Sequence, residues 1–327
     1  MLTKRHQILS WIEQGIIAPE DAERALRIAG VFPDPKGWHR FVGQLLLGLG
    51  ILSSVIGVVF FVAFNWDILG KFGKFALVEG LLIVSLLPLL RYGASSRIGQ
   101  FALLGASILV GALLALFGQI YQTGADTWEL FWSWALLILP WVGLGRFAPL
   151  WILWIGIANT ELILYFSLFP SPQIFGRLSD GAVALAVLIF NALVTVIWEF
   201  FLRSRPGSSR IALRIPATLA GIAATVLALR AIMDNHTASH LLWLAIWALW
   251  LGAHCLFYRY KIRDLFMLTG GCLSAIVVFT GFIGRVLIES HTEFFGFLVI
   301  TIVLIAAGTG ATTWLRHTAR AWETSDD

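Results

Sequence analysis

Charge is scarce in this sequence. Asp, Glu, Lys and Arg together make up 13% of its 327 residues, whereas about a quarter of a soluble globular domain is usually charged. Hydrophobic residues reach 58%, above the roughly one half that is typical of such domains. The shortage of charge therefore argues against an ordinary soluble protein and favours a chain that resides in a lipid bilayer.

Cysteine and recognisable reaction motifs are scarce as well. Cys255 and Cys272 both lie in apolar segments and have neither the spacing of a metal site nor that of a disulfide framework. The sequence contains no phosphate-binding loop, nucleophile elbow or HExxH zinc motif. We therefore expect no cofactor and no metal, and a non-enzymatic role is favoured over an enzymatic one. The net charge of +4 comes without a nucleic-acid-binding motif, so nucleic acid is not an expected partner.

Long apolar runs dominate the chain. A helix needs about 20 apolar residues to cross the hydrocarbon core of a bilayer. Ten runs approach or exceed this length, at 41–64, 74–90, 99–120, 129–145, 147–168, 180–202, 211–232, 240–258, 264–288 and 293–315. Only Gly145 and Arg146 separate the fourth run from the fifth, which leaves open a tight hairpin or one kinked element. We expect an all-α, polytopic membrane helix bundle of about ten transmembrane helices over residues 41–315.

Lys and Arg are distributed unevenly between the two sides of this bundle. All but five of the 23 basic residues fall on the side of the two chain ends, the five being Lys71, Lys74, Arg177, Arg230 and Arg285. Cytoplasmic loops are enriched in Lys and Arg. The asymmetry therefore predicts that the N- and C-termini are both cytoplasmic.

The N-terminal 30 residues are polar and helical in pattern, and they lack the features of a signal peptide. Gly15 is placed to end a first helix, and Pro19 to begin a second. Because about thirty residues cannot bury a stable core alone, we expect this cytoplasmic hairpin to pack on a protein partner, on another copy of the chain or on the membrane. Residues 31–40 are expected to form a linker, and residues 316–327 a cytoplasmic tail.

A few polar side chains interrupt the apolar spans. Ionisable groups inside a bilayer are costly, and each is a functional hypothesis by default. Several fall toward the outer half of the bundle, which predicts an outward-facing polar cavity. The candidate residues for this cavity are Glu79, Gln119, Tyr121, Asp126, Asn159, Glu161, Asn191, Arg230 and Arg285.

Within this set, Glu161 and Arg285 are the preferred ion pair. Glu161 lies about 10 Å below the outer end of its span, too deep for its side chain to reach water easily. The alternative is that each polar group pairs locally and only fixes helix register. Glu199 and Arg203, four residues apart at the cytoplasmic edge, are interpreted as an interfacial pair on one helix.

The segment Phe117 to Leu130, FGQIYQTGADTWEL, gathers polar residues in an otherwise apolar region. Gly124 allows a tight turn, and Asp126 or Thr127 can cap the helix that follows. The segment is either a helix–turn–helix joint at the outer interface or a lid-like mouth over the cavity.

Two motifs carry a family resemblance. The pattern WIEQGIIAPEDAERAL near the N-terminus and the joint GQIYQTGAD resemble the bacterial family of predicted membrane proteins called domain of unknown function 2157. The resemblance covers roughly residues 1–145. It implies a bacterial inner-membrane protein, and it supplies no catalytic residues because the family has no established activity.

Three functions stay open on this basis. The chain is a small-solute transporter or binder that uses the polar cavity, or a non-transporting scaffold or regulator that acts through residues 1–30. The third alternative is an intramembrane enzyme on envelope or lipid-linked substrates, with Glu161 or Asp126 as a base, but no nucleophile, base and orienting group are assembled. Two halves of five spans are compatible with the inverted repeats of transporters. The expected partners are the lipid bilayer and either a small solute or a protein.

Overall fold

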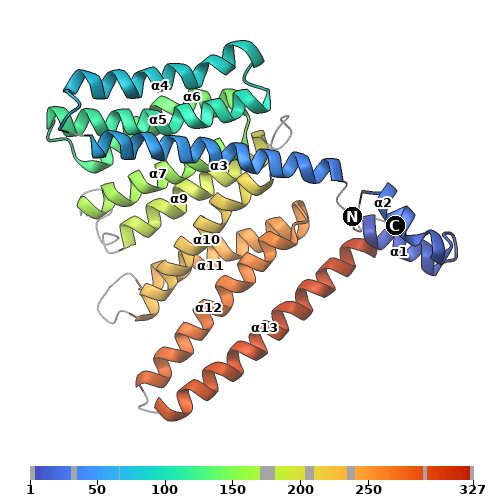
Figure 1. Ribbon diagram of the computed structural model, residues 1–327. Coiled ribbons are helices and arrows are strands. Elements are labelled where there is room, and N and C mark those ends of the chain that lie inside the picture. Colours follow the sequence, from blue (N-terminus) through green and yellow to red (C-terminus); the bar gives the residue numbers. More distant parts are fainter. Residues whose placement is uncertain are drawn as a thin grey trace. The chain divides into compact units, whose positions relative to one another are not determined.

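The computed structural model describes residues 4–30, 35–65, 67–169, 181–202, 210–233, 240–289 and 293–324. Within these ranges the chain is built from helices and contains no strand (Figure 1). The expected all-α fold is therefore confirmed.

Ten helices in the described ranges are long and apolar enough to cross a membrane. They are α3 (Pro35–Phe64), α4 (Lys71–Tyr92), α5 (Arg97–Tyr121), α6 (Thr127–Gly145), α7 (Ala148–Leu168), α9 (Ala182–Ile197), α10 (Arg210–Met233), α11 (His240–Leu256), α12 (Leu265–Glu289) and α13 (Glu293–Thr324). Each coincides with one apolar run of the sequence. The polytopic bundle is thus confirmed, and the chain is a membrane protein with multiple spans.

The boundary between α6 and α7 answers the question that the sequence left open. Arg146 adopts a left-handed conformation with φ of 43°, which stops α6. Pro149 then lies in the first turn of α7, where its missing N–H costs nothing. The Gln100 side chain donates a hydrogen bond to the Gly145 carbonyl at 3.2 Å and holds the end of α6 against α5. The two runs are therefore separate helices, and these two helices pack on each other.

The N-terminal residues form the expected helical hairpin. Helix α1 (Lys4–Glu13) is followed by a turn in which Gly15 has a φ of 72°, a value that favours glycine. A short 3-10 turn at Pro19–Asp21 leads into α2 (Ala22–Ile28), which packs on α1.

Residues 1–57 and 316–327 form one compact unit, and residues 58–315 form another. Helical structure extends further than the sequence indicated at both ends of the bundle. Helix α3 already begins at Pro35, inside the expected linker, and α13 runs to Thr324 through most of the expected tail.

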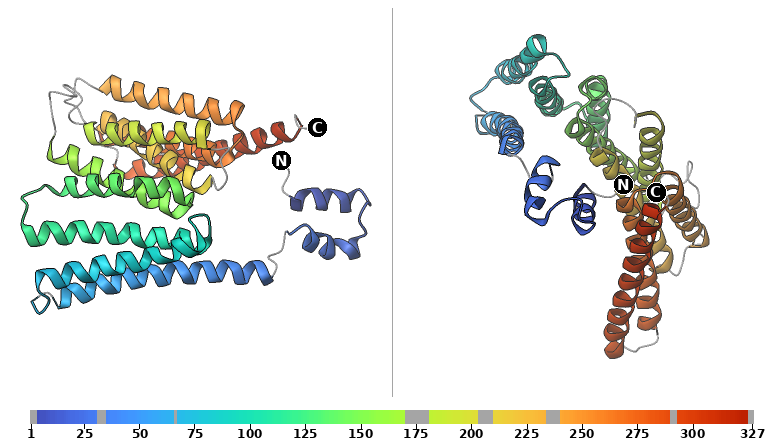
Figure 2. Two further views of the ribbon diagram at one scale, coloured as in Figure 1. Left: turned by 90° about the horizontal axis from the view of Figure 1, so that it is seen from above. Right: turned by 90° about the vertical axis from the view of Figure 1, so that its right-hand side faces the viewer.

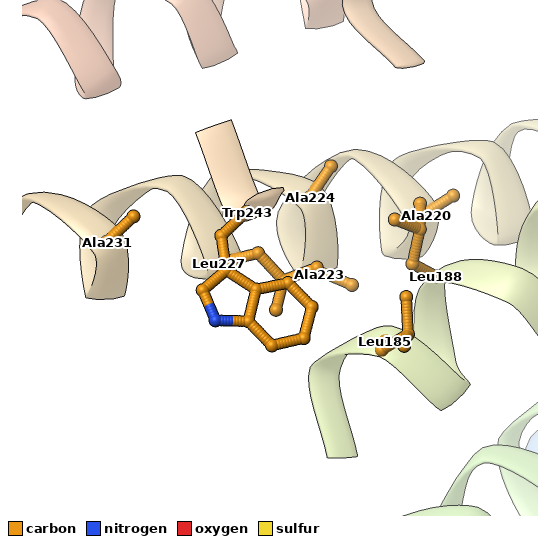
Figure 3. Close-up of a cluster of buried hydrophobic side chains, with 8 residues drawn as sticks. All are labelled: Leu185, Leu188, Ala220, Ala223, Ala224, Leu227, Ala231 and Trp243. Atoms are coloured by element: carbon orange, nitrogen blue, oxygen red, sulfur yellow. The ribbon is translucent and has the colours of Figure 1, made fainter. Parts of the chain in front are cut away.

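The larger unit is a series of neighbouring helices. Each helix from α4 to α12 packs on the next one along the chain, and α10 contacts α9, α11 and α12 (Figures 1 and 2). Helix α10 is rich in buried alanine. Small side chains let helix backbones approach closely in a membrane, which allows α10 to pack on three neighbours. In Figure 3 the indole of Trp243, from α11, lies against Leu227 and Ala223 of α10, with Leu185 and Leu188 of α9 nearby.

Candidate binding site at the basic end of α9 to α12

Two of the predicted cavity residues lie in direct contact. The Asn191 amide of α9 donates to Oδ1 of Asn159 at 2.6 Å, and the Asn159 amide of α7 donates back to Oδ1 of Asn191 at 3.2 Å. Each amide also donates to a carbonyl four residues earlier, that of Ile155 or Val187, both at 2.8 Å. Both side chains are buried. The pair therefore links α7 and α9 through two reciprocal hydrogen bonds.

The other predicted cavity residues are spread over several helices. Arg285 donates to Glu289 at 2.9 Å, one turn further along α12, rather than to Glu161. Glu161 is half-buried on α7. The exposed members of the set are Glu79, Gln119, Tyr121, Asp126 and Arg230. The outward-facing polar cavity stays a prediction.

The segment between α5 and α6 has the geometry of a helix–turn–helix joint. Gln122 and Gly124 adopt positive φ values of 43° and 66°. Asp126 is the N-cap residue of α6, and its carbonyl, rather than its side chain, accepts the Glu129 N–H at 3.1 Å. The turn residues are exposed.

The structure places two adjoining cavities at the other end of α9 to α12. This basic end is the one that carries Arg210, Arg214, Arg259, Lys261 and Arg263. The first, which we term the Glu199 cavity, has a volume of 370 Å³ and lies between α9, α10 and α11. Its wall is apolar except for a few groups, among them Thr195, Glu199, His254 and Tyr258.

Two polar residues of the Glu199 cavity, Glu199 and Tyr258, lie on π-helical turns. One turn, Trp198–Leu202, extends α9, and the other, Phe257–Lys261, extends α11. π-helical turns are rare and are frequent at functional sites. Glu199 is only 6% exposed and Tyr258 only 2%, and both side chains line the cavity. The turns therefore bring a carboxyl group and a phenol into an apolar wall.

His254 separates the Glu199 cavity from the second cavity. Its ring stacks on Trp250 at a centroid distance of 4.9 Å and contacts Tyr258 at 4.8 Å. Its Nε2 lies 2.9 Å from the Met267 carbonyl oxygen of α12. Trp250, His254 and Ala217 of α10 line both cavities and form their common wall.

The second cavity, which we term the α10–α12 groove, has two adjoining hollows. The inner hollow of 360 Å³ lies between α10, α11 and α12, and a more open one of 400 Å³ extends it toward Arg214. Thr218 and Phe266 line both hollows, so the groove is continuous.

A cluster of charged side chains lies at the Arg214 end of the groove, which we term the groove mouth. Arg210 donates to Oδ2 of Asp264 from Nη2 at 2.6 Å and from Nε at 3.1 Å, while Arg214 reaches Oδ1 at 3.4 Å. The Phe266 backbone N–H donates to Oδ1 at 3.0 Å, so Asp264 also caps α12. Burial raises the pKa of Asp264, but the hydrogen bonds and charges of the two arginines, together with the Phe266 amide, outweigh it and hold this pKa below its ordinary value.

Sequence reasoning missed the Glu199 cavity. The expected pair of Glu199 and Arg203 stays a prediction, because Arg203 lies outside the described residues, but burial of Glu199 in a cavity wall was not expected. One signal was available: Trp250, His254 and Tyr258 recur every four residues, which aligns polar and aromatic groups on one helix face.

The comparisons with known proteins concern the other half of the chain. Residues 9–151 match the model of the family described as "Predicted membrane protein (DUF2157)", which confirms the resemblance of the N-terminal motifs. No curated protein and no solved structure matches the chain. Over residues 9–151, this multi-span membrane protein is therefore similar to the DUF2157 family of predicted membrane proteins.

Proposed function

We propose that this chain binds a small lipophilic cation in the Glu199 cavity, as a membrane transporter or a membrane-bound binding protein. The observation that carries the proposal is the Glu199 carboxyl group, 6% exposed in the wall of a largely apolar cavity between membrane-spanning helices. An ionisable group at such a position is costly and is retained for a function by default.

The composition of the wall selects the chemistry of the ligand. Phe200, Trp250 and Phe257 line the cavity, and aromatic rings attract cations over their faces. Among the described residues that line it, none is Lys or Arg. The volume of 370 Å³ falls in the range of about 300–1,000 Å³ that is usual for small-molecule sites. A delocalised organic cation matches the carboxylate, the aromatic faces and the apolar remainder together.

Equilibrium binding of tetraphenylphosphonium to the full chain in lipid nanodiscs tests the proposal. Glu199→Gln should weaken the affinity at least about tenfold, or ~1.4 kcal/mol, because the amide removes the charge that faces the cation. Glu289→Gln is the matched control, since this carboxylate is exposed and pairs with Arg285 on α12. Equal affinities for the two variants, or binding that does not saturate, would contradict the proposal.

A measurement of tetraphenylphosphonium flux distinguishes a transporter from a binding protein. Proteoliposomes that contain the chain should take up tetraphenylphosphonium faster than empty liposomes if the chain is a transporter. Saturable binding without flux would leave a binding protein.

The membrane and its orientation belong to the same proposal. The resemblance to the DUF2157 family supports a bacterial inner membrane, and the Lys and Arg asymmetry supports an orientation with both termini in the cytoplasm. Alkaline phosphatase fused after residue 327 should then be inactive in cells, because this reporter folds only outside the cytoplasm. An active fusion would invert the orientation.

A scaffold or regulator is the second candidate, and the N-terminal hairpin favours it. Trp11, Ile16 and Ile28 are 45%, 66% and 81% exposed on the hairpin and the turn within it. Exposed apolar side chains gathered on so small a unit are typical of an interaction surface. Deletion of residues 1–30 should then abolish a cross-linked complex in cells and leave tetraphenylphosphonium binding unchanged. Cross-linking that survives the deletion would remove this candidate.

A further inference from the structure

The α10–α12 groove presents apolar side chains to the outside of the bundle. Ile222 of α10 and Phe266 and Leu273 of α12 line it and are 55%, 47% and 60% exposed. In a membrane-spanning bundle, such a face contacts lipid chains rather than water.

The hydroxyl groups of the groove are already engaged. Thr218 donates to the Arg214 carbonyl and Thr269 to the Leu265 carbonyl, both at 2.7 Å and within their own helices. Thr225 and Ser274 share a hydrogen bond of 2.7 Å across the groove floor. These hydroxyls leave little polar capacity for a ligand, so the groove suits a hydrocarbon chain better than a polar solute.

The length of the groove matches one leaflet. On α10 its lining runs from Ile211 to Val226, and the part between Arg214 and Val226 is about 18 Å long at 1.5 Å per residue. Half of a hydrocarbon core of about 30 Å is about 15 Å. An acyl chain lying along α10 and α12 would therefore extend from the groove mouth to about the bilayer midplane.

The groove mouth carries a surplus of positive charge. Arg210 takes Oδ2 of Asp264 with two donors, at 2.6 and 3.1 Å, while Arg214 makes only a long contact of 3.4 Å with Oδ1. The Arg214 guanidinium lies over the Phe266 ring at 4.4 Å, and its Nε makes no hydrogen bond within the described part of the chain. Among these three side chains one carboxylate faces two guanidinium groups, which leaves them a net charge of about +1. Arg214 makes the weaker contact with Asp264, and its side chain is 35% exposed.

We propose that the α10–α12 groove is a binding site for an anionic phospholipid, with one acyl chain in the groove and the headgroup phosphate on Arg214. A guanidinium binds phosphate with paired N–H donors. The basic end of the bundle is also where the Lys and Arg asymmetry predicts the cytoplasmic leaflet, whose anionic lipids attract basic side chains. This site is separate from the Glu199 cavity and does not depend on the cation proposal.

Native mass spectrometry of the delipidated full chain in detergent tests the headgroup. Phosphatidylglycerol and phosphatidylcholine with identical acyl chains are titrated in parallel. The unaltered chain should prefer phosphatidylglycerol about fivefold, the effect expected of one arginine near an anionic surface. Arg214→Gln should bring the ratio close to one. Arg91→Gln is the matched control and should leave the ratio unchanged, because Arg91 also lies over an aromatic ring, that of Tyr92, at a helix end.

A second pair of variants tests the acyl chain. Gly270 lines the inner hollow, and a Cβ built there meets no atom within 4 Å. Gly270→Phe therefore places a bulky side chain in the groove and should reduce phosphatidylglycerol binding severalfold. Gly252→Phe is the control, since Gly252 of α11 also has open space but lines neither cavity.

Four results would overturn the proposal. The first is an equal effect of the Arg214 and Arg91 variants on the lipid ratio. The second is undiminished binding to the Gly270→Phe chain, which would place the lipid outside the groove. The third is a preference that survives in the Arg214 variant. The fourth is displacement of phosphatidylglycerol by millimolar glycerol phosphate, which would identify a site for a soluble anion instead.

Discussion

The Asn159–Asn191 pair predicts a measurable coupling between α7 and α9. Two reciprocal amide hydrogen bonds, of 2.6 and 3.2 Å, join the two helices inside the bundle. We consider three variants: Asn159→Ala, Asn191→Ala and the double replacement. Each single replacement removes both interhelical bonds at once and leaves the partner amide buried with part of its capacity unmet.

The size of the coupling energy follows from the number of interhelical hydrogen bonds. Double-mutant cycles in membrane helices give about 0.6 kcal/mol for an average interhelical hydrogen bond and about 1.7 kcal/mol at most. Two bonds that break together should therefore contribute a coupling energy of about 1–2 kcal/mol. Each single variant should lose about 2–3 kcal/mol of unfolding free energy, because the unmet partner adds its own penalty. The double variant should lose less than the sum of the two.

The assay is reversible unfolding of the full chain in mixed micelles with increasing dodecyl sulfate. Thr160→Ala and Thr195→Ala form the control cycle, since each hydroxyl donates to a carbonyl of its own helix, at 2.9 and 2.8 Å. The control coupling should be near zero. If the losses of unfolding free energy of the two single asparagine variants add to within about 0.3 kcal/mol in the double variant, the coupling between α7 and α9 is refuted.

The remaining predictions use the same unfolding assay. Gly111→Ala should cost about 1–3 kcal/mol, because its new methyl group would meet the Trp134 indole, whereas Gly118→Ala has open space and should change stability little. Trp154→Phe should cost about 1 kcal/mol, since it removes an indole N–H that donates to a carbonyl of α6 at 3.0 Å. The pKa of Asp264 is lower in the folded state than its unfolded value of about 4. The ionised carboxylate therefore stabilises the fold above about pH 4, and this stabilisation is lost as the pH falls through the folded-state pKa. Unfolding free energy should therefore fall on acidification below about pH 4, and Asp264→Asn should remove that part of the pH dependence; an unchanged pH profile would contradict the role of this carboxylate.

The sequence predicted the spans well because the bilayer sets their length. An apolar run near 20 residues has few alternatives to a membrane helix. The break between α6 and α7 was left open, since Gly145 and Pro149 weaken a continuous helix there but also allow a kinked one. The hairpin turn at Gly15 followed from the same local reasoning.

The candidate site was much less predictable. The expected ion pair of Glu161 and Arg285 joined two helices, but Arg285 has Glu289 one turn away on its own helix, and a local partner needs no tertiary packing. Burial of Glu199 depends on a π-helical turn and on packing against α11, more than fifty residues away. Neither can be read from residue spacing along one segment.

The stacked rings of Trp250 and His254 have a consequence for access. They are the only side chains of α11 that face both the lipid-exposed groove and the cavity of Glu199 in the described structure. The hydrogen-bond contact of 2.9 Å between His254 and the Met267 carbonyl keeps the imidazole in that place. A displacement of this wall, which Ala217 of α10 completes, would break the contact to Met267 and join the two spaces into one passage. A molecule dissolved among the lipid chains would then reach the buried carboxyl group sideways, through the membrane interior, without first entering water.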